Sequence, residues 1–582
     1  MPNETHRPPT SRPLLFPHSQ SKMSQFTRKL NTAPTVPAVR RTLAQRFAQP
    51  VPTVPVPRAP KTVTGSIVTA PHHYAKTTTV NEAGGKAFRK SSAFELVTLI
   101  FTTLLAGKKG PKKFYTSEAQ TISRLQTLVS GDPFFAAQCA VYARRVLGLR
   151  SVTHAVAAMV VHATKGSGQP WVRQFVQSVI YRPDDAIEIV AAYIHFYGGG
   201  KSIRKPAGKR GKRLPVTLPY PLKKGIAAEL SKLDAYQLAK YQKSDQAITL
   251  ADLFNLTHPV PTAENAANVK AFIRGELKNE DTWEARLSAA GSSVVAKEEA
   301  WCGLLETKKL GYFAALRNLR NILQQAPGAV DATLALLTNQ RAIQRSLVLP
   351  TQFSRAYQEV KISGLPRAAE AAAALERAIE ISCSNIPVLP GKTLVCLDES
   401  GSMGGRETDL SPANVGSLFA GVVLKSQPNA DFMAFSTGAQ YVHVNKSLPL
   451  YQLVGAIRSN WHGGSTNFHA IFDAASTKYD NIIVLSDQEG WTLGQRWDSE
   501  MGAPTSARRR YEQKFGTLPF IVVFDLQGAN SMMFPEDSVA TLAGFSDKVF
   551  TLLQELRKNP SALVTEVGKM DFAAINAGDE ED

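Results

Sequence analysis

The spacing of apolar residues changes near residue 388 and divides the chain into two halves. From about residue 81 to residue 386, apolar positions recur every three or four residues, and this period predicts amphipathic helices. The main runs are 132–148, 152–164, 184–198, 222–243, 250–256, 264–277, 297–323, 330–343 and 366–381. Short loops between such helices favour stacked antiparallel neighbours, so we expect an α-solenoid with an extended, curved surface.

After residue 388 the pattern changes to short, continuous apolar runs that alternate with helical segments. Leu394–Leu397 and the runs at 431–436, 481–486 and 520–525 have the length and content of buried strands. Strands of this kind separated by helices predict a doubly wound parallel sheet. The expected fold is therefore multidomain, with a helical array followed by an α/β domain.

The first of these strands leads into the sequence Asp398-x-Ser400-x-Ser402. A polar loop between a strand and a helix lies at the carboxyl end of a parallel sheet, where open α/β sheets bind ligands. One carboxylate and two hydroxyls are hard oxygen ligands, so the loop favours Mg²⁺ or Mn²⁺ over zinc or copper. Taken alone, the pattern is equally consistent with a loop that merely caps a helix.

Two later segments complete a three-part set. His462–Thr466 (His-Gly-Gly-Ser-Thr) precedes a helical run, and the apolar strand that starts at residue 481 ends in Asp487. Together with the first loop, this set resembles the metal-ion-dependent adhesion site of von Willebrand factor A domains. The resemblance implies hydroxyl ligands and nearby acids that often act through water; the residues are Asp398, Ser400, Ser402, Thr466 and Asp487.

The match to this metal site has two departures. Ser465 stands one residue away as a rival to Thr466, and Glu399 replaces the apolar residue usual between the Asp and the first Ser. The alternative is a metal-free A domain whose acids cap helices.

The positive net charge of the chain indicates that the protein binds a polyanion. The net charge is +19, and residues 1–80 hold eleven Lys or Arg against one acid, together with thirteen prolines. A packed core is precluded there, so we predict a disordered basic arm that either adds phosphate affinity or is only a tail.

A second basic segment lies within the helical half. Residues 201–213 hold seven basic residues and no acid. Phosphate contact is favoured there over a solvated surface, through residues that include Arg204, Lys205, Lys209 and Arg210, with Lys223 and Lys224 soon after.

Other features narrow the class of protein. No apolar run reaches the ~18 residues of a membrane span, and the basic N-terminus has no apolar signal region. His154 lies on an apolar helix and is expected to be a hydrogen-bonded core histidine. The four cysteines share no ligand-type spacing and are expected to be reduced core residues of a cytoplasmic protein; they are Cys139, Cys302, Cys383 and Cys396.

Several separated segments of the helical half carry distinctive motifs. The most specific are residues 236–243 (Tyr-Gln-Leu-Ala-Lys-Tyr-Gln-Lys) and 250–261 (Leu-Ala-Asp-Leu-Phe-Asn-Leu-Thr-His-Pro-Val-Pro), and others lie at 132–137, 150–154, 316–321 and 345–350. Together these segments resemble the Ro/TROVE family of RNA-binding proteins, and the resemblance runs over nearly all of 85–390. The family order, a TROVE domain and then an A domain, is also kept.

This resemblance implies a ring of HEAT-like helical pairs closed by the A domain. It also implies that structured Y RNAs dock on the outer surface and that single-stranded ends of defective RNAs enter the central hole. Lys240 and His258 match positions that contact RNA in the family. The next basic position of the family falls on Ser244, and Lys243 is its candidate replacement. Without the resemblance, Lys240 reads as a solvated charge and His258 as the cap of the helix that ends at Thr257.

The sequence therefore predicts a nonenzymatic, monomeric RNA-binding ring that acts as a scaffold in RNA quality control or processing. A divalent cation in the A domain would recruit a 3′ exoribonuclease or another protein. One alternative is a metal-dependent phosphoesterase or nuclease that uses Asp398 and Asp487, although it has few carboxylates and no general base. Another is an A-domain adhesin, against which the lack of a secretion signal argues. The expected domains are the arm (1–80), a TROVE domain (81–388), an A-like domain (389–565) and an acidic tail (566–582).

Overall fold

A computed structural model gives the fold of the chain. It describes residues 74–81, 85–102, 118–200, 215–241, 248–277, 286–287, 290–291, 293–308, 310–346, 348–404, 411–459, 461–490, 504–526, 531–534, 538–543, 553–559 and 562–578. Most of the predicted basic arm and the basic segment 201–213 lie outside these residues. Within the described ranges, no helix combines the length and apolar character that crossing a membrane requires.

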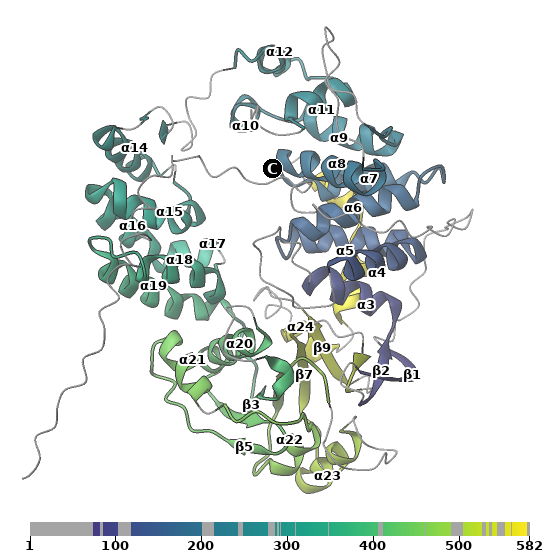
Figure 1. Ribbon diagram of the computed structural model, residues 1–582, viewed down its shortest axis with the longest axis vertical. Coiled ribbons are helices and arrows are strands. Elements are labelled where there is room, and N and C mark those ends of the chain that lie inside the picture. Colours follow the sequence, from purple (N-terminus) through teal and green to yellow (C-terminus); the bar gives the residue numbers. More distant parts are fainter. Residues whose placement is uncertain are drawn as a thin grey trace, which may run out of the picture. The chain divides into compact units, whose positions relative to one another are not determined.

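Helices dominate the first half of the chain (Figure 1). Their bounds are α3 Ser92–Thr102, α4 Glu118–Gly131, α5 Pro133–Arg145, α6 Ser151–Ala163, α7 Trp171–Val179, α8 Pro183–Tyr197, α9 Tyr220–Ser231, α10 Ala235–Lys240, α11 Leu250–Thr257, α12 Ala266–Arg274, α14 Val294–Glu306, α15 Tyr312–Gln325, α16 Val330–Leu337, α17 Gln340–Ser346, α18 Ser354–Lys361 and α19 Ala368–Ser382.

Capping residues set several of these boundaries. Asp132 begins α5, because its carboxylate accepts a hydrogen bond from the Phe135 N–H at 3.0 Å. The run 222–243, predicted as one helix, is two helices, because Asp234 starts a new capping box at α10. The run 297–323 is likewise divided, since α14 ends at Glu306 and α15 begins only after Gly311.

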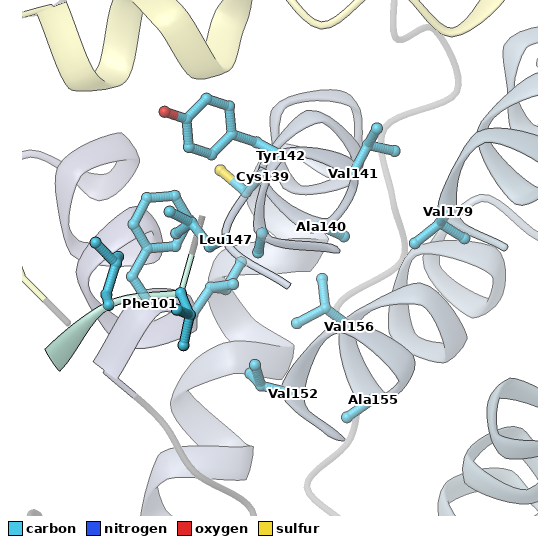
Figure 2. Packing of buried hydrophobic residues seen from close by; sticks show 14 of the residues in the cluster. Phe101, Cys139, Ala140, Val141, Tyr142, Leu147, Val152, Ala155, Val156 and Val179 are labelled. Carbon is cyan, nitrogen blue, oxygen red and sulfur yellow. The ribbon is translucent and has the colours of Figure 1, made fainter. Parts of the chain in front are cut away.

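Neighbouring helices bury their apolar faces against each other. Helix α5 packs on α6 and α7, α6 packs on α8, and α7 packs on α9. Figure 2 shows Ala140 and Val141 of α5 together with Val156 of α6 and Val179 of α7, all fully buried. The prediction of reduced core cysteines is confirmed for three positions, Cys139, Cys383 and Cys396, which are buried and free; Cys302 is free and partly buried.

The second half contains a six-stranded sheet in the order β5-β4-β3-β6-β7-β9. The strands are β3 Thr393–Asp398, β4 Ala430–Phe435, β5 Ala439–Tyr441, β6 Asn481–Ser486, β7 Phe520–Asp525 and β9 Val539–Ala543. All pairs are parallel except β4 with β5. This is the doubly wound order, and its switch point falls between β3 and β6, where ligands bind in such sheets.

Both faces of the sheet are covered by helices, which are α20 Pro412–Ser426, α21 Leu450–Ser459, α22 His469–Ala474 and α23 Thr505–Phe515. Along β3, Leu394 and Cys396 join the core on the α22 and α23 side, while Val395 and Leu397 join the core on the α20 side. This alternation follows from the two-residue period of a strand. The predicted combination of a helical array with a doubly wound sheet is confirmed.

The N-terminal part of the described chain packs on the C-terminal domain. Strands β1 Tyr74–Val80 and β2 Lys86–Lys90 form an antiparallel hairpin, and β2 also pairs with β8 Ser531–Met532. The Asn81 side chain donates to the Gly490 carbonyl at 2.9 Å. Residues 74–80, predicted to lie in a disordered arm, are therefore a strand, because a partner distant in the sequence pairs with the hairpin.

The C-terminal end packs on the helical array. After α24 Leu553–Lys558, helix α25 Ala562–Gly568 contacts α5, and α26 Phe572–Gly578 contacts α7. The predicted acidic tail at 566–582 thus contains the end of α25 and all of α26. The apolar ring of Phe572, 4% exposed, explains the difference, because it packs on helices of the first half.

Candidate functional site

The carboxyl ends of β3 and β6 bring two buried acids together. Asp398 is the last residue of β3, Asp487 directly follows β6, and both are 0% exposed. The two strands are parallel neighbours, with Leu397 opposite Leu485, so their ends meet at one edge of the sheet. The acids therefore lie at the carboxyl end of the sheet, as the sequence predicted, and the strand order places them at its switch point.

The Asp-x-Ser-x-Ser loop folds back onto its own acid. The Ser400 N–H donates to one oxygen of Asp398 at 2.9 Å, and the Ser486 hydroxyl donates to the other oxygen at 2.5 Å. The hydroxyl oxygens of Ser400 and Ser402 lie 3.2 Å apart. The structure thus groups the three predicted ligands of this loop.

The second predicted segment reaches this loop through its backbone. The Gly401 N–H donates to the Gly464 carbonyl at 3.0 Å. Gly463 and Gly464 have φ values of 71° and 115°, a region that side chains disfavour, which explains the Gly-Gly pair. Ser465 and Thr466 follow and are both buried, and the Ser465 hydroxyl has no hydrogen-bond partner among the described groups. Both residues therefore stay candidate ligands.

The electrostatics of the edge suit a bound cation. Burial raises the pKa of Asp398, and the charge of Asp487 raises it further. Burial also raises the pKa of Asp487, although the neighbouring Ser402 hydroxyl lowers it. Asp487 Oδ2 and Glu399 Oε1 are buried without a hydrogen-bond partner in the described structure. The edge therefore combines two acids whose negative charge is disfavoured by burial, carboxylate oxygens without a hydrogen-bond partner, and adjacent hydroxyls. This donor set fits a hard divalent cation.

A buried ion pair at the same edge was missed by sequence reasoning. Asp525 ends β7 and lies opposite Ser486 of β6, and Lys90 Nζ lies 2.7 Å from its Oδ2. Both side chains are 0% exposed. The position of Asp525 could have been inferred, because it ends a predicted strand. Nothing in the sequence indicates Lys90, which is 435 residues away from its partner.

The donor set offers little support for hydrolytic chemistry. Among the described residues, no group of three or more His, Cys, Asp or Glu side chains could hold a metal ion. Two-metal phosphoesterases hold their ions about 4 Å apart and need several converging ligands. The site at Asp398 and Asp487 depends on hydroxyls instead, and Asp525 is already paired with a lysine. The nuclease alternative is therefore not supported.

In the helical half, His258 has an unusual backbone. It ends α11 in the left-handed conformation, with φ 49° and ψ 62°, and its N–H donates to the Phe254 carbonyl at 3.0 Å. The predicted helix cap is confirmed. A residue with a side chain pays roughly 1–2 kcal/mol for this conformation. The imidazole is exposed to solvent, so it is accessible to a ligand.

Three predicted RNA-binding lysines lie on nearby helices of the array. Lys240 ends α10 with Nζ 5.5 Å from the centre of the exposed Tyr236 ring. Lys223 and Lys224 lie in the first turns of α9, which packs on α11, the helix that His258 ends. Among the described residues, no carboxylate forms an ion pair with any of these three lysines. The other predicted RNA-binding residues, Lys243, Arg204, Lys205, Lys209 and Arg210, lie outside the described residues.

A buried acid explains the segment Arg150–His154. Asp185 of α8 is 0% exposed and accepts hydrogen bonds from Arg144 Nη2 at 2.8 Å, Arg150 Nη2 at 3.0 Å and His154 Nε2 at 2.8 Å. Burial alone would raise the pKa of Asp185, but His154 and the two guanidinium groups hold it well below its usual range. The prediction that His154 is a hydrogen-bonded core histidine is confirmed.

Comparison with known proteins identifies the helical half. The family model described as the TROVE domain matches residues 96–275 and 267–381. This part of the chain is a TROVE domain. The match confirms the resemblance drawn from the short segments, and it covers the helices α3 to α19 that carry Lys240 and His258.

Two curated relatives are similar to part of the chain, and one solved structure has a similar fold. Telomerase protein component 1 of Mus musculus is 22% identical over 345 residues, 46% of this chain, and that of Rattus norvegicus is 22% identical over 309 residues, 39% of this chain. This TROVE protein spans only 12% and 11% of the lengths of those relatives. The RO (RSR) protein of Deinococcus radiodurans has a similar fold, with a TM-score of 0.53 and 18% identity, over 80% of this chain and 100% of that chain.

Proposed function

We propose that this chain binds RNA through its TROVE domain and serves as a nonenzymatic scaffold of a small ribonucleoprotein. The observation that supports this most is the TROVE match over 96–275 and 267–381, which contains the exposed His258 and the lysines of α9 and α10. Cationic side chains without acidic partners release counterions from phosphates when they bind. Structured RNA is recognised mainly by shape and by its unpaired nucleotides.

In finer detail, a Y-like structured RNA would dock on the outer surface of the helical array. Single-stranded ends of misfolded RNA would enter a central hole, and the protein would act in RNA quality control or processing. This part of the proposal rests on the family resemblance.

We further propose that one divalent cation, Mg²⁺ or Mn²⁺, binds at the sheet edge. Asp398, Ser400, Ser402, Asp487 and either Thr466 or Ser465 would hold it. Such an ion offers an open position to a carboxylate of a partner, for example a 3′ exoribonuclease. A ligand that binds only the folded state adds about 2.7 kcal/mol of stability at 100 times its dissociation constant. We therefore expect added Mg²⁺ to raise the melting temperature of the wild type but not of Asp487→Ala, and an equal rise in both would contradict the site.

RNA binding is tested most cleanly with variants that leave the backbone undisturbed. Asn tolerates the left-handed conformation, so His258→Asn should fold normally while it removes the imidazole. Lys240→Gln removes one charge at a partly exposed position. We expect each variant to weaken binding of a hairpin RNA with a single-stranded tail by about 10-fold or more, measured by fluorescence anisotropy, since a hydrogen bond to a charged group contributes about 1.5–3 kcal/mol.

A matched control is available in α18. Lys361 Nζ lies 5.5 Å from the centre of the Tyr357 ring, the same arrangement as Lys240 over Tyr236 at 5.5 Å. Lys361 is outside the predicted RNA-binding positions, so Lys361→Gln should leave the affinity unchanged. If Lys240→Gln and His258→Asn also bind like the wild type, the proposed contact positions are wrong.

A further inference from the structure

A cavity opens between the end of α6 and the start of α9. Its volume is about 640 Å³, within the range of small-molecule sites. The turn after α6 forms one wall, and the residues that lead into α9 form the other. The cavity lies wholly within the TROVE domain and includes none of the residues grouped at the sheet edge.

The floor of this cavity is apolar. It is lined by Val161 of α6, Val172 of α7 and Leu218, which are 1%, 2% and 5% exposed. Buried aliphatic side chains of this kind cannot hold a charged group, but they accept the flat face of an aromatic ring. The floor therefore favours a ligand with a planar, weakly polar part.

The rim carries an exposed aromatic ring. Tyr220 lines the cavity, and 69% of its surface is accessible to solvent. Lys224 Nζ lies 5.7 Å from the centre of this ring. Exposed aromatic rings beside cations are the platforms on which single-stranded nucleic acid stacks its bases.

The rim is also positively charged. Lys165 and Lys223 both line the cavity, and neither forms an ion pair with a described carboxylate. Gly166 and Gly168 in the turn have φ values of 79° and 68°, and open space surrounds the position of a Cβ at each. A phosphate could therefore approach this turn closely without meeting a side chain.

We propose that this cavity takes one unpaired nucleotide of a bound RNA. The base lies against Tyr220 and the apolar floor, and the phosphates on either side of it pair with Lys165 and Lys223. This inference rests on the proposed RNA-binding function and adds a specific recognition site to it. An apolar protein segment would also suit the floor, but it would leave both lysines without a partner, so a nucleotide is favoured.

The test compares two RNA hairpins that have the same loop. The stem of one is fully paired, and the stem of the other carries a single unpaired 2-aminopurine nucleotide whose fluorescence falls when it stacks. With the full-length protein, we expect the second hairpin to bind about 10-fold more tightly, as one stacked base contributes, and its fluorescence to fall. Tyr220→Ala should abolish both effects and leave the paired hairpin unaffected, whereas Tyr220→Phe, which keeps the ring, should retain them. Lys165→Gln should weaken binding of the second hairpin more than that of the first.

The outcomes separate this inference from the function on which it rests. If neither hairpin binds, the proposed RNA-binding function is wrong and the cavity proposal fails with it. If both bind but the unpaired nucleotide adds no affinity, or if its contribution survives Tyr220→Ala, the cavity proposal alone is overturned. Unchanged RNA affinities for all three variants would point instead to a protein segment as the occupant. Tyr220 and Lys165 are both exposed, so none of these substitutions should disturb folding.

Discussion

The buried carboxylate of Asp185 links its own helix, α8, to residues of α5 and α6. Arg144 of α5 and His154 of α6 both donate to it, and Arg150 lies directly before α6. Arg144 is only 4% exposed, so loss of the acid would leave a buried charge without its partner. Such losses cost about 3–5 kcal/mol. The hydrogen bonds therefore make Asp185 a structural residue of the TROVE domain.

We expect Asp185→Asn to lower the free energy of unfolding by about 3 kcal/mol or more, measured by urea denaturation. Because the folded state depresses the pKa of Asp185, its contribution is present above the unfolded pKa of about 3.9 and is lost as the pH falls below that value. The wild type should therefore lose stability between about pH 5 and pH 2 more steeply than the variant.

The neighbouring acid provides the control for this prediction. Asp184 pairs with Arg150 at 2.8 Å, but its side chain is 17% exposed and that of Arg150 is 31% exposed. Because solvent screens such a pair, Asp184→Asn should cost about 1 kcal/mol or less. An equal loss from both variants would contradict the special role of the buried acid.

The environments of some of these residues could be predicted from the sequence. The apolar surroundings of His154 correctly indicated a core residue, and Asp398 and Asp487 followed from the ends of two predicted strands. Asp185 was not identified as the partner of His154, because the two are 31 residues apart and only the packing of α6 on α8 brings them together.

At the scale of elements, a buried ion pair attaches the hairpin of β1 and β2 to the six-stranded sheet. Lys90 at the end of β2 pairs with Asp525 at the end of β7, and β2 is followed directly by the first helix of the array. The hairpin therefore connects the helical half with the edge that carries Asp398 and Asp487.

We expect Lys90→Met to destabilise the protein by about 3–5 kcal/mol, because it removes the cation that pairs with the buried Asp525. The double variant Lys90→Met with Asp525→Asn should recover much of this loss, since it removes the buried negative charge as well. Thermal or urea unfolding of both single variants and the double variant gives the coupling energy. Additive losses would show that the two side chains do not depend on each other.

The four apolar strands were predictable because each is a continuous run of core residues, and all four form close to the expected positions. The other strands were not predicted. Strands β1 and β2 are rich in Thr and Lys and follow a proline-rich segment, while β9 (Val-Ala-Thr-Leu-Ala) has a weak apolar signal. The partner of β1 is the neighbouring β2, but β2 also pairs with β8, more than 400 residues later in the sequence, and no local period shows that pairing.

At the scale of the whole described chain, each end packs on the half of the chain that is farther away in sequence. The first strands pair with the C-terminal domain, and the last helix packs on the helical array. Phe572 of α26 lies against Phe134 and Phe175, with ring centroids 5.7 Å and 5.6 Å away. The Ser178 hydroxyl of α7 donates to the Phe572 carbonyl at 3.1 Å. Sequence reasoning missed this helix because the acidic residues at the end of the chain dominate the composition of residues 566–582.

We expect Phe572→Ala to cost about 3–5 kcal/mol because it removes a buried aromatic ring. Amide hydrogen exchange should become faster in α5 and α7, which α25 and α26 cover, and stay slow in β3 and β6. Phe572→Leu, which keeps most of the apolar volume, should cost much less. Uniformly faster exchange across both halves would contradict a local role for α26.

The most direct test of the central proposal is the salt dependence of RNA affinity for the full-length protein. The probe is a hairpin with a single-stranded tail, and its dissociation constant is measured from 50 to 200 mM KCl. If the lysines of α9 and α10 and their neighbours bind about four phosphates, the affinity should fall about 100-fold over this range, linearly in the logarithm of salt concentration. Absence of binding at the lowest salt concentration, or an affinity that does not change with salt, would contradict the account.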